Sequence, residues 1–322
     1  MNVSVVMPVR NEEAHLAAAV DRVLAQDHDG ELEIVIAVGP SADRTESLAR
    51  ALADTHEEVR VVANPTGYTP AGLNLAIAAA RHDVIVRVDG HGELSEGYIA
   101  RAVELLEETG AANVGGVMDA QGRTAFERAV AAAYNSPYGL GGGGFHLKDT
   151  PPGPAETVFL GVFRREALES VGGFDETLLR AQDWELNHRL RKAGFIVYFS
   201  PDLRVVYRPR STYKALAEQF YRTGSWRREV IRRYPETASV RYLAPPVAVA
   251  GFTGGLLGGL AGLVTRNRWL TVLLLAPTVY ALFLVLATLR TPADAAAKRH
   301  LPLVLAVMHG CWGLGFLRSK PA

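Results

Sequence analysis

Short apolar runs alternate with longer amphipathic segments over the first 90 residues. Four runs are rich in valine and isoleucine, and between them apolar residues recur at helical spacing. Runs of this length and composition are typical of buried strands. Their alternation with helices predicts an α/β domain with a mostly parallel sheet and right-handed crossovers. The expected strands are residues 3–7, 32–38, 59–63 and 84–88.

A different pattern begins near residue 242. Residues 242–264 and 269–289 contain no charged side chain, and each is long enough to cross the ~30 Å hydrocarbon core of a membrane as a helix. Residues 265–268 would join them in a tight hairpin. Residues 301–317 are shorter and carry His309, so they form either a third span or a re-entrant segment. The alternative is a buried helical pair in a soluble domain.

Between these regions, residues 211–234 mix six basic side chains with aromatic ones. This predicts an amphipathic helix on an anionic membrane surface, with membrane lipids as partners; a solvated charged face is the alternative. Positive charge beside a span predicts that the N-terminal domain lies on the cytoplasmic side of the plasma membrane, anchored by several spans. We therefore expect three regions: an α/β domain (1–210), an interfacial helix region (211–241) and a membrane domain (242–322).

Composition and charge argue against some classes of protein and partner. The 322 residues carry no formal net charge, which argues against nucleic acid as a partner. The single cysteine excludes a disulfide framework within the chain, and no secretory signal is visible. Residues 135–156 are rich in glycine and proline, and they form either a linker or a mobile lid over a bound substrate.

The strand-like run at 84–88 ends in Asp89-Gly90-His91. Ligands of open α/β sheets bind beyond the carboxyl ends of the strands, and Gly90 lets the chain bend so that both side chains can face one ion. Carboxylate and imidazole together suit a divalent metal, which could neutralise the diphosphate of a nucleotide sugar. The alternative is a helix cap by Asp89 and a surface His91.

Five segments in this order resemble motifs of the family 2 glycosyltransferases of the GT-A fold. They are residues 3–13, 39–45, 89–91, 158–176 and 181–186. The resemblance extends to a branch, the succinoglycan-type glucosyltransferases of exopolysaccharide assembly, through residues 136–139 and 312–316. It implies a GT-A fold followed by two or three transmembrane helices.

The resemblance also implies an activity, which is inverting transfer of a sugar from a nucleotide sugar, UDP-glucose or similar, to a lipid-linked or membrane-associated acceptor. Asp183 would be the general base, with a helix N-cap as its alternative role. Asp89 and His91 would bind the metal, with Mn²⁺ preferred over Mg²⁺ because imidazole suits Mn²⁺ better. The donor would be contacted by Pro8, Arg10, Glu12, Asp43, Asn74 and Asp89, although Asp43 is also suited to a turn or helix cap.

Several positions depart from the family pattern. Asp89-Gly90-His91 replaces the usual Asp-x-Asp, a change also found in the polypeptide N-acetylgalactosamine transferases. Val38 and Gly39 stand where an acidic residue commonly helps to hold uracil. The processive motif Gln-x-x-Arg-Trp is interrupted by Thr223. Two alternative functions follow: a polyprenyl-phosphate glycosyltransferase, and an inactive membrane-anchored scaffold that binds sugar nucleotides.

Overall fold

The computed structural model describes residues 1–318, which divide into two compact units. Unit 1 contains residues 1–119 and 148–207, and unit 2 contains residues 120–147 and 208 onward. The chain thus passes from the first unit into the second, returns, and leaves again near residue 207. The predicted limit at residue 210 lies close to the last crossing, but residues 120–147, assigned to the α/β domain by sequence, belong with the C-terminal helices.

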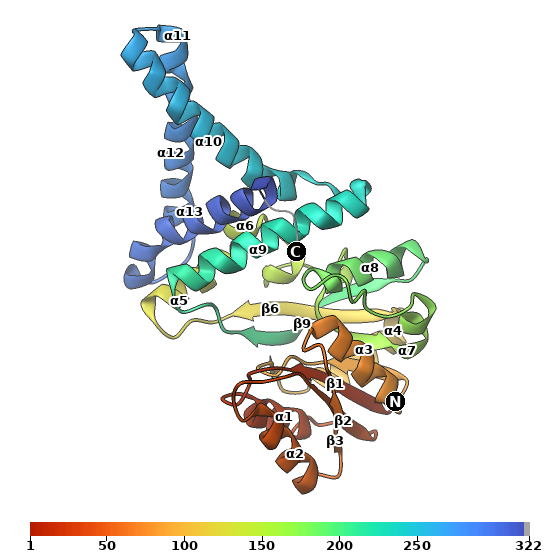
Figure 1. Ribbon diagram of the computed structural model, residues 1–322. Coiled ribbons are helices and arrows are strands. Elements are labelled where there is room, and N and C mark those ends of the chain that lie inside the picture. The colour runs from red at the N-terminus through yellow and green to blue at the C-terminus, as the bar shows by residue number, and fades with distance from the viewer. Residues whose placement is uncertain (319–322) are drawn as a thin grey trace. The chain divides into compact units, whose positions relative to one another are not determined.

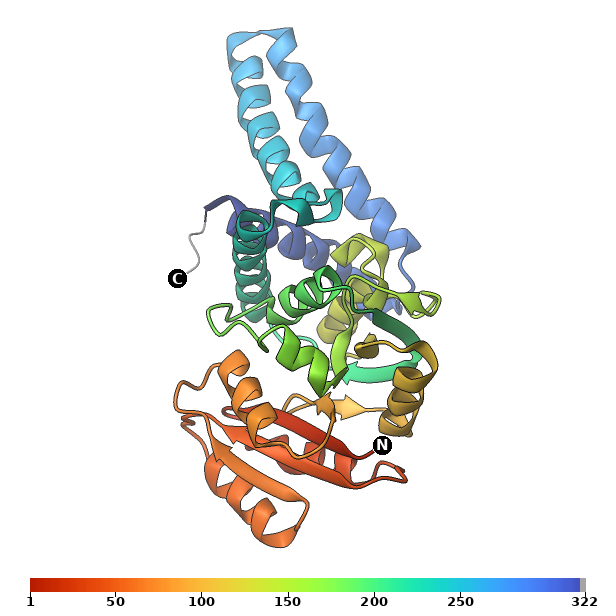
Figure 2. The same ribbon diagram turned by 90° about the vertical axis from the view of Figure 1, so that its right-hand side faces the viewer.

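Four parallel strands form the first half of the unit 1 sheet, in the order β3-β2-β1-β4. Almost every side chain of β1 and β2 is buried, because helices cover both faces of the sheet (Figures 1 and 2). The predicted strands and the parallel arrangement are confirmed. The strands are β1 (Val3–Val9), β2 (Leu32–Val38), β3 (Val59–Ala63) and β4 (Val84–Arg87).

The remaining strands join antiparallel, so the nine-stranded sheet is mixed. Next to β4 lies β8, then β6, β9 and the short β5, while β7 pairs with β9. Antiparallel strands do not need a helical crossover between them. This explains why the regular alternation of strand-like and helical segments ends near residue 88. The strands are β5 (Glu93–Leu94), β6 (Asn113–Ala120), β7 (Gly153–Pro154), β8 (Phe159–Arg164) and β9 (Val197–Tyr207).

Helices complete unit 1. Helices α1 and α2 lie on one face of the parallel strands and α3 lies on the other (Figures 1 and 2). The apolar residues of α1 recur at helical spacing and are buried, which explains why this helix was predictable. The six helices are α1 (Leu16–Leu24), α2 (Thr45–Thr55), α3 (Thr69–Ala79), α4 (Tyr98–Thr109), α7 (Arg165–Ser170) and α8 (Gln182–Lys192).

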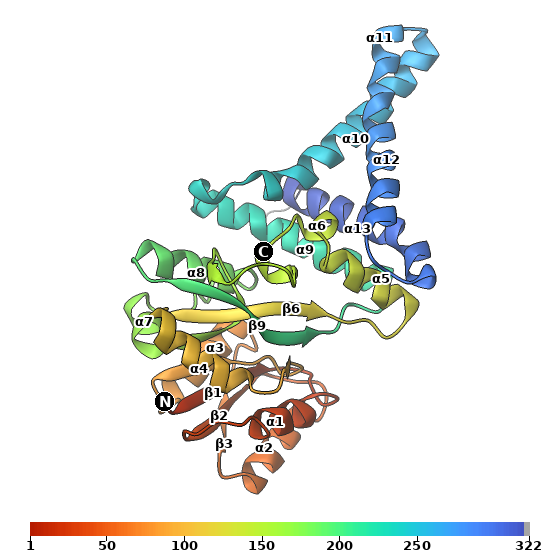
Figure 3. The ribbon, with the colours of Figure 1, turned by 180° about the vertical axis from the view of Figure 1, so that it is seen from behind.

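Unit 2 is helical. Helices α10 and α12 run side by side as a long hairpin, and α13 lies across its base, alongside α9 (Figures 1 and 3). Three helices are long and apolar enough to span a membrane: Val240–Thr265, Arg268–Arg290 and Ala295–Arg318. The elements are α5 (Ala125–Tyr134), α6 (Pro137–Leu140), η1 (Gly144–His146), α9 (Tyr213–Arg233), η2 (Pro235–Thr237), α10 (Val240–Thr265), α11 (Arg268–Thr271), η3 (Val272–Leu274), α12 (Leu275–Arg290) and α13 (Ala295–Arg318).

The apolar face of α9 is covered by protein. Gly224 faces the backbone of Trp312, and Gly315 on α13 faces the backbone of Tyr221, so the two helices approach as closely as small residues allow. Phe220 is buried between Tyr134 and Trp312. The predicted helix is therefore confirmed, and it packs along α13, but of its aromatic side chains Phe220 is buried by protein while Tyr221 stays exposed.

Candidate active site

The loops that follow β1, β2 and β4 meet at the carboxyl edge of the parallel strands, where the sequence placed the site. The β1 and β2 loops are joined by hydrogen bonds. Asp43 accepts one from the backbone N–H of Glu13 at 3.2 Å, and Thr45 Oγ1 accepts one from the N–H of Glu12 at 2.7 Å. Asp43 also accepts from the hydroxyl of Thr45, which lowers the pKa of that carboxyl. The structure therefore shows Asp43 as a loop-building residue, and its contact with a nucleotide stays a prediction.

Arg87, the last residue of β4, is the buried centre of the site. Only 4% of its surface is exposed. Its Nε and Nη2 atoms donate to Asp89 Oδ1 at 3.2 and 3.0 Å. Its Nη1 atom donates to Asp183 Oδ1, 96 residues further along the chain. One guanidinium thus ties the predicted metal ligand to the predicted base, and it balances only one of their two negative charges.

Asp183 stands in the first turn of α8, a helix whose N-cap is Ala181 with φ of 62°. The capping alternative for Asp183 is therefore not what the structure shows. The helix dipole at this end favours a carboxylate, and the side chain is about 39% exposed, so it is open to an incoming group. Both properties suit a proton acceptor.

His91 is oriented by Glu12. The ring Nδ1 lies 2.8 Å from Glu12 Oε1. Because a carboxylate can only accept, Nδ1 carries the proton, and in the neutral ring the lone pair is then on Nε2. A metal-binding histidine normally has this arrangement, with its second nitrogen bonded to a carboxylate. The structure thus gives the Glu12 side chain a supporting position, and its contact with the nucleotide stays a prediction.

The donor set fits a divalent cation only in part. Within residues 1–318, no three side chains of His, Cys, Asp or Glu converge on a point that could hold a metal. Asp89 and His91 would thus supply two ligands, and a cation would need diphosphate oxygens or water for the others. Gly90 makes their loop compact, because a Cβ there would lie 2.9 Å from side-chain atoms of Glu12 and Val9.

Three other predicted donor contacts have different surroundings. Pro8 lies within β1, and Arg10 Nε donates to the carbonyl of Pro40 at 3.2 Å. Asn74 on α3 accepts from the N–H of Phe174 and donates to its carbonyl, both at 2.9 Å. Asn74 thereby fixes the segment after α7 against α3. Whether these residues touch a donor stays a prediction.

Sequence reasoning missed Arg87. Its signal was present, because a single arginine interrupts the apolar run Val84-Ile85-Val86-Arg87-Val88. A buried charge needs a partner of opposite sign, so an arginine at the end of a buried strand predicts a carboxylate beyond it. That Asp183 is one of the partners could not be read from the sequence.

Comparison with known proteins agrees with this geometry. Residues 4–172 match the sequence profile of glycosyl transferase family 2. The succinoglycan biosynthesis protein ExoA of Rhizobium meliloti (strain 1021) is 31% identical over 98% of this chain and 94% of its own length. The dolichyl N-acetyl-alpha-D-glucosaminyl phosphate 3-beta-D-2,3-diacetamido-2,3-dideoxy-beta-D-glucuronosyltransferase of Methanococcus voltae is 24% identical over 98% of this chain and 96% of its own.

Among solved structures, the mannosyltransferase PcManGT from Pyrobaculum calidifontis, in complex with GDP-Man and Mn²⁺, is similar in fold. Its TM-score is 0.58 at 20% identity, over 98% of this chain and 87% of its own. The mixed sheet of unit 1 is thus that of the GT-A glycosyltransferases, as predicted. Both the profile match and the near full-length relative lead to one conclusion: the chain belongs to glycosyl transferase family 2.

Proposed function

We propose that the protein is an inverting glycosyltransferase that requires a divalent cation. In this proposal it moves a sugar from a nucleotide sugar to a lipid-linked acceptor during polysaccharide assembly. The observation that carries the proposal is the bridge formed by the buried Arg87, which brings the partly exposed Asp89 and Asp183 together although they are far apart in sequence. An inverting transfer needs a group that supports the leaving diphosphate and a base for the acceptor, and the two carboxylates supply these at one site.

Each residue has a distinct part in this reaction. Asp183 takes the proton of the acceptor hydroxyl as that oxygen attacks the anomeric carbon. Asp89 and the Nε2 atom of His91 would hold a cation, which when bound would supply positive charge to offset that of the leaving diphosphate. Glu12 keeps His91 in the metal-binding tautomer, and Arg87 fixes the positions of both aspartates.

Relatives support a membrane-bound acceptor. One near full-length relative is named for succinoglycan biosynthesis, and another is named as a transferase acting on a dolichyl-linked sugar phosphate. Three helices of this chain are long and apolar enough to cross a membrane. We therefore place the protein in the plasma membrane with unit 1 in the cytoplasm. The polyprenyl-phosphate alternative differs only in whether the acceptor already carries a sugar.

The test is transfer by the purified full chain in detergent or lipid nanodiscs. Radiolabelled UDP- and GDP-sugars are offered with either a polyprenyl phosphate or a lipid-linked sugar, and label in the organic extract is counted. We expect label on the lipid-linked sugar, more with Mn²⁺ than with Mg²⁺. Full transfer in excess chelator would exclude the cation, and binding of every donor without turnover would favour the scaffold alternative.

A further inference from the structure

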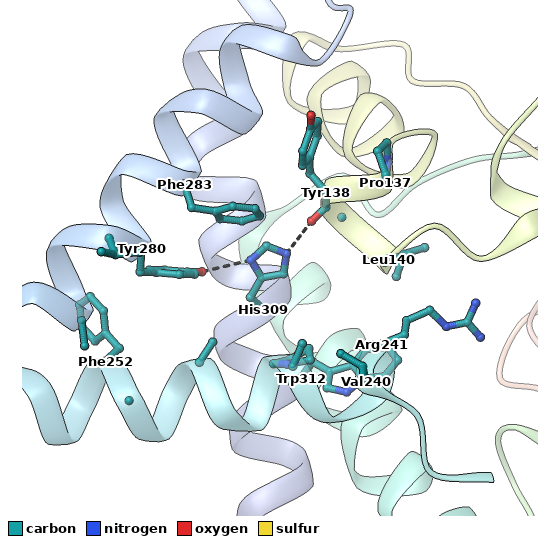
Figure 4. A pocket seen from close by; sticks show the side chains of 18 of the residues that line it. Pro137, Tyr138, Leu140, Val240, Arg241, Phe252, Tyr280, Phe283, His309 and Trp312 are labelled. Atoms are coloured by element: carbon teal, nitrogen blue, oxygen red, sulfur yellow. Dashed lines mark hydrogen bonds between the residues drawn. The ribbon is translucent and has the colours of Figure 1, made fainter.

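The candidate membrane helices of unit 2 enclose a large apolar pocket. Its volume is about 790 Å³, within the ~300–1,000 Å³ typical of small-molecule sites. Its walls come from α6, α10, α12 and α13, and Figure 4 shows the side chains around it. Aromatic rings line one side of the pocket. Three of them, labelled in Figure 4, are Tyr280, Phe283 and Phe252.

One histidine is hydrogen-bonded to two other walls of the pocket. His309 on α13 lies between α6 and α12, with Nε2 2.8 Å from the carbonyl of Tyr138 and Nδ1 3.1 Å from the hydroxyl of Tyr280 (Figure 4). A carbonyl only accepts, so Nε2 donates and Nδ1 accepts from the tyrosine. The neutral ring satisfies both bonds at once, and it joins three pocket walls.

The α10 wall is built from small residues. Ala244, Ala248 and Gly251 face the pocket at spacings of four and three residues, which places them on one side of the helix. A Cβ at Gly251 would meet no atom within 4 Å. The width of the pocket therefore depends on small side chains, and a side chain at Gly251 would begin in open space beside the pocket.

Positive charge lies at one margin of this apolar space. Arg241 lines the pocket immediately before the charge-free run of α10, a position at the membrane interface where basic side chains meet headgroups. Its guanidinium donates to the hydroxyl of Tyr242 and points away from His309 (Figure 4). The glycine-rich turn packs on it, since a Cβ at Gly143 would lie 3.0 Å from Arg241 Nη1.

The same turn has a backbone suited to anions. Gly141 and Gly142 both adopt left-handed conformations, with φ of 68° and 70°, directly after the helical Leu140. Where a helical residue is followed by a left-handed one, as at Leu140 and Gly141, successive N–H groups turn to one side, the arrangement found in anion-binding concavities. A guanidinium and an anion-binding turn at the margin of an apolar pocket fit an amphiphile that joins a phosphate to a hydrocarbon chain.

We propose that this pocket holds the isoprenoid units nearest to the phosphate of a polyprenyl-phosphate-linked acceptor, with the phosphate beside Arg241. The inference rests on the proposed function, and it names the lipid class of the acceptor. A methyl-branched, unsaturated chain is wider than a saturated acyl chain and matches a wide pocket walled by aromatic rings. The isoprenoid tail lies in hydrocarbon whether it is in the bilayer or in the pocket, so the fit of its branched shape selects it and Arg241 sets the position of the phosphate.

The test is photolabelling of the full chain in nanodiscs with a geranylgeranyl phosphate that carries a diazirine near the end of its chain. Labelling requires no turnover, so its outcome is separate from whether the protein transfers sugar. We expect labelled peptides from α10, α12 or α13, and competition by unlabelled geranylgeranyl phosphate. Phosphatidylglycerol and geranylgeraniol should compete at least about tenfold more weakly.

Two matched pairs of variants locate the lipid. Gly251→Leu fills the pocket and should lower labelling about tenfold or more. Gly254→Leu is the control, since it is on the same helix and outside the pocket, and a Cβ there also meets nothing within 4 Å. Arg241→Gln should weaken competition by geranylgeranyl phosphate but not by geranylgeraniol. Arg290→Gln, at the C-terminal end of α12 and outside the pocket, is the control and should change neither.

Three results would overturn the proposal. Equal competition by phosphatidylglycerol would show a general acyl groove. Equal competition by geranylgeraniol would show that no phosphate is recognised. Equal labelling of Gly251→Leu and Gly254→Leu would place the lipid elsewhere. Donor turnover measured in the same preparations separates these outcomes from a failure of the proposed transfer.

Discussion

At the catalytic edge of unit 1, charged side chains hold one another in place, whereas in unit 2 packed helices and a single polar contact shape an apolar pocket. Arg87, Asp89 and Asp183 lie at the carboxyl edge of a sheet, and each position depends on the charge of the others. His309 and the small residues of α10 instead depend on shape and on neutral hydrogen bonds. The two proposed roles, transfer chemistry and lipid binding, thus fall on separate sets of residues, so we expect that each can be damaged alone.

The largest expected effect is on the chemistry. Asp183→Asn keeps the shape of the side chain and an acceptor for Arg87, but the amide cannot take a proton. We expect transfer to fall by about 10²–10⁴-fold, with nucleotide-sugar binding and photolabelling of the unit 2 pocket nearly unchanged. The measurement is kcat of the purified variant. Asp54→Asn, an exposed change on α2, is the control, and near wild-type kcat in Asp183→Asn would place the base elsewhere.

A smaller effect is expected at the carboxylate behind His91. Glu12→Gln removes the charge that orients the ring and raises the basicity of its Nε2 atom. Loss of such a partner typically weakens metal binding about 10–100-fold, so the Mn²⁺ concentration for half-maximal rate should rise accordingly. Glu46→Gln, which changes only an exposed pair with Arg50, is the control. An unchanged Mn²⁺ requirement would remove His91 or Glu12 from the metal site.

A single substitution in α9 is expected to lower the stability of unit 2. Gly224→Ala places a methyl group against the backbone of Trp312 and Phe316, and overpacking of this kind costs about 1–3 kcal/mol. Gly310→Ala on α13 meets no atom within 4 Å and should cost nothing. Thermal unfolding in detergent measures both. If the two variants melt alike, the close contact of α9 and α13 does not stabilise the unit.

The smallest expected effect is on the stability of the protein at acid pH. Burial, reinforced by Arg241, lowers the pKa of His146 from 6.5 to about 3. The folded protein therefore keeps this ring neutral where the unfolded chain protonates it, so stability is full above pH 6.5 and declines as the pH falls from there toward 3. Over this range the free energy of unfolding falls by up to about 1.4 kcal/mol for each pH unit. His146→Leu should flatten the decline in melting temperature between pH 6.5 and 5, and an identical decline would assign it to other groups.

Sequence reasoning predicted the parallel strands well because their side chains are buried on both faces, and such runs are visible without knowledge of any contact. It also placed Asp89 and His91 correctly beyond β4, since local order alone brings them to the sheet edge. The bonds from Arg87 to Asp183 and from His91 to Glu12 join residues 96 and 79 positions apart. Such pairings depend on how loops fold back, so no local pattern contains them.

The pocket of unit 2 could not be predicted from the sequence for a different reason. An uninterrupted apolar run shows that a helix can enter a membrane, but it does not show which of its faces meets protein and which meets lipid. Gly224 lies inside α9, although glycine weakens isolated helices. In the structure it is the point of closest contact with α13, so the same residue favours packing where local propensity disfavours helix.

The order of synthesis gives the division of the chain a further consequence. Helices α5 and α6 are made early, yet α13, which packs against both, is made after every other element of unit 2. Unit 1 lacks only residues 148–207 at that early stage and can fold as soon as they leave the ribosome. Unit 2 cannot close until α13 is in place, so its pocket is completed only after every residue of unit 1 has been synthesised and is available to fold.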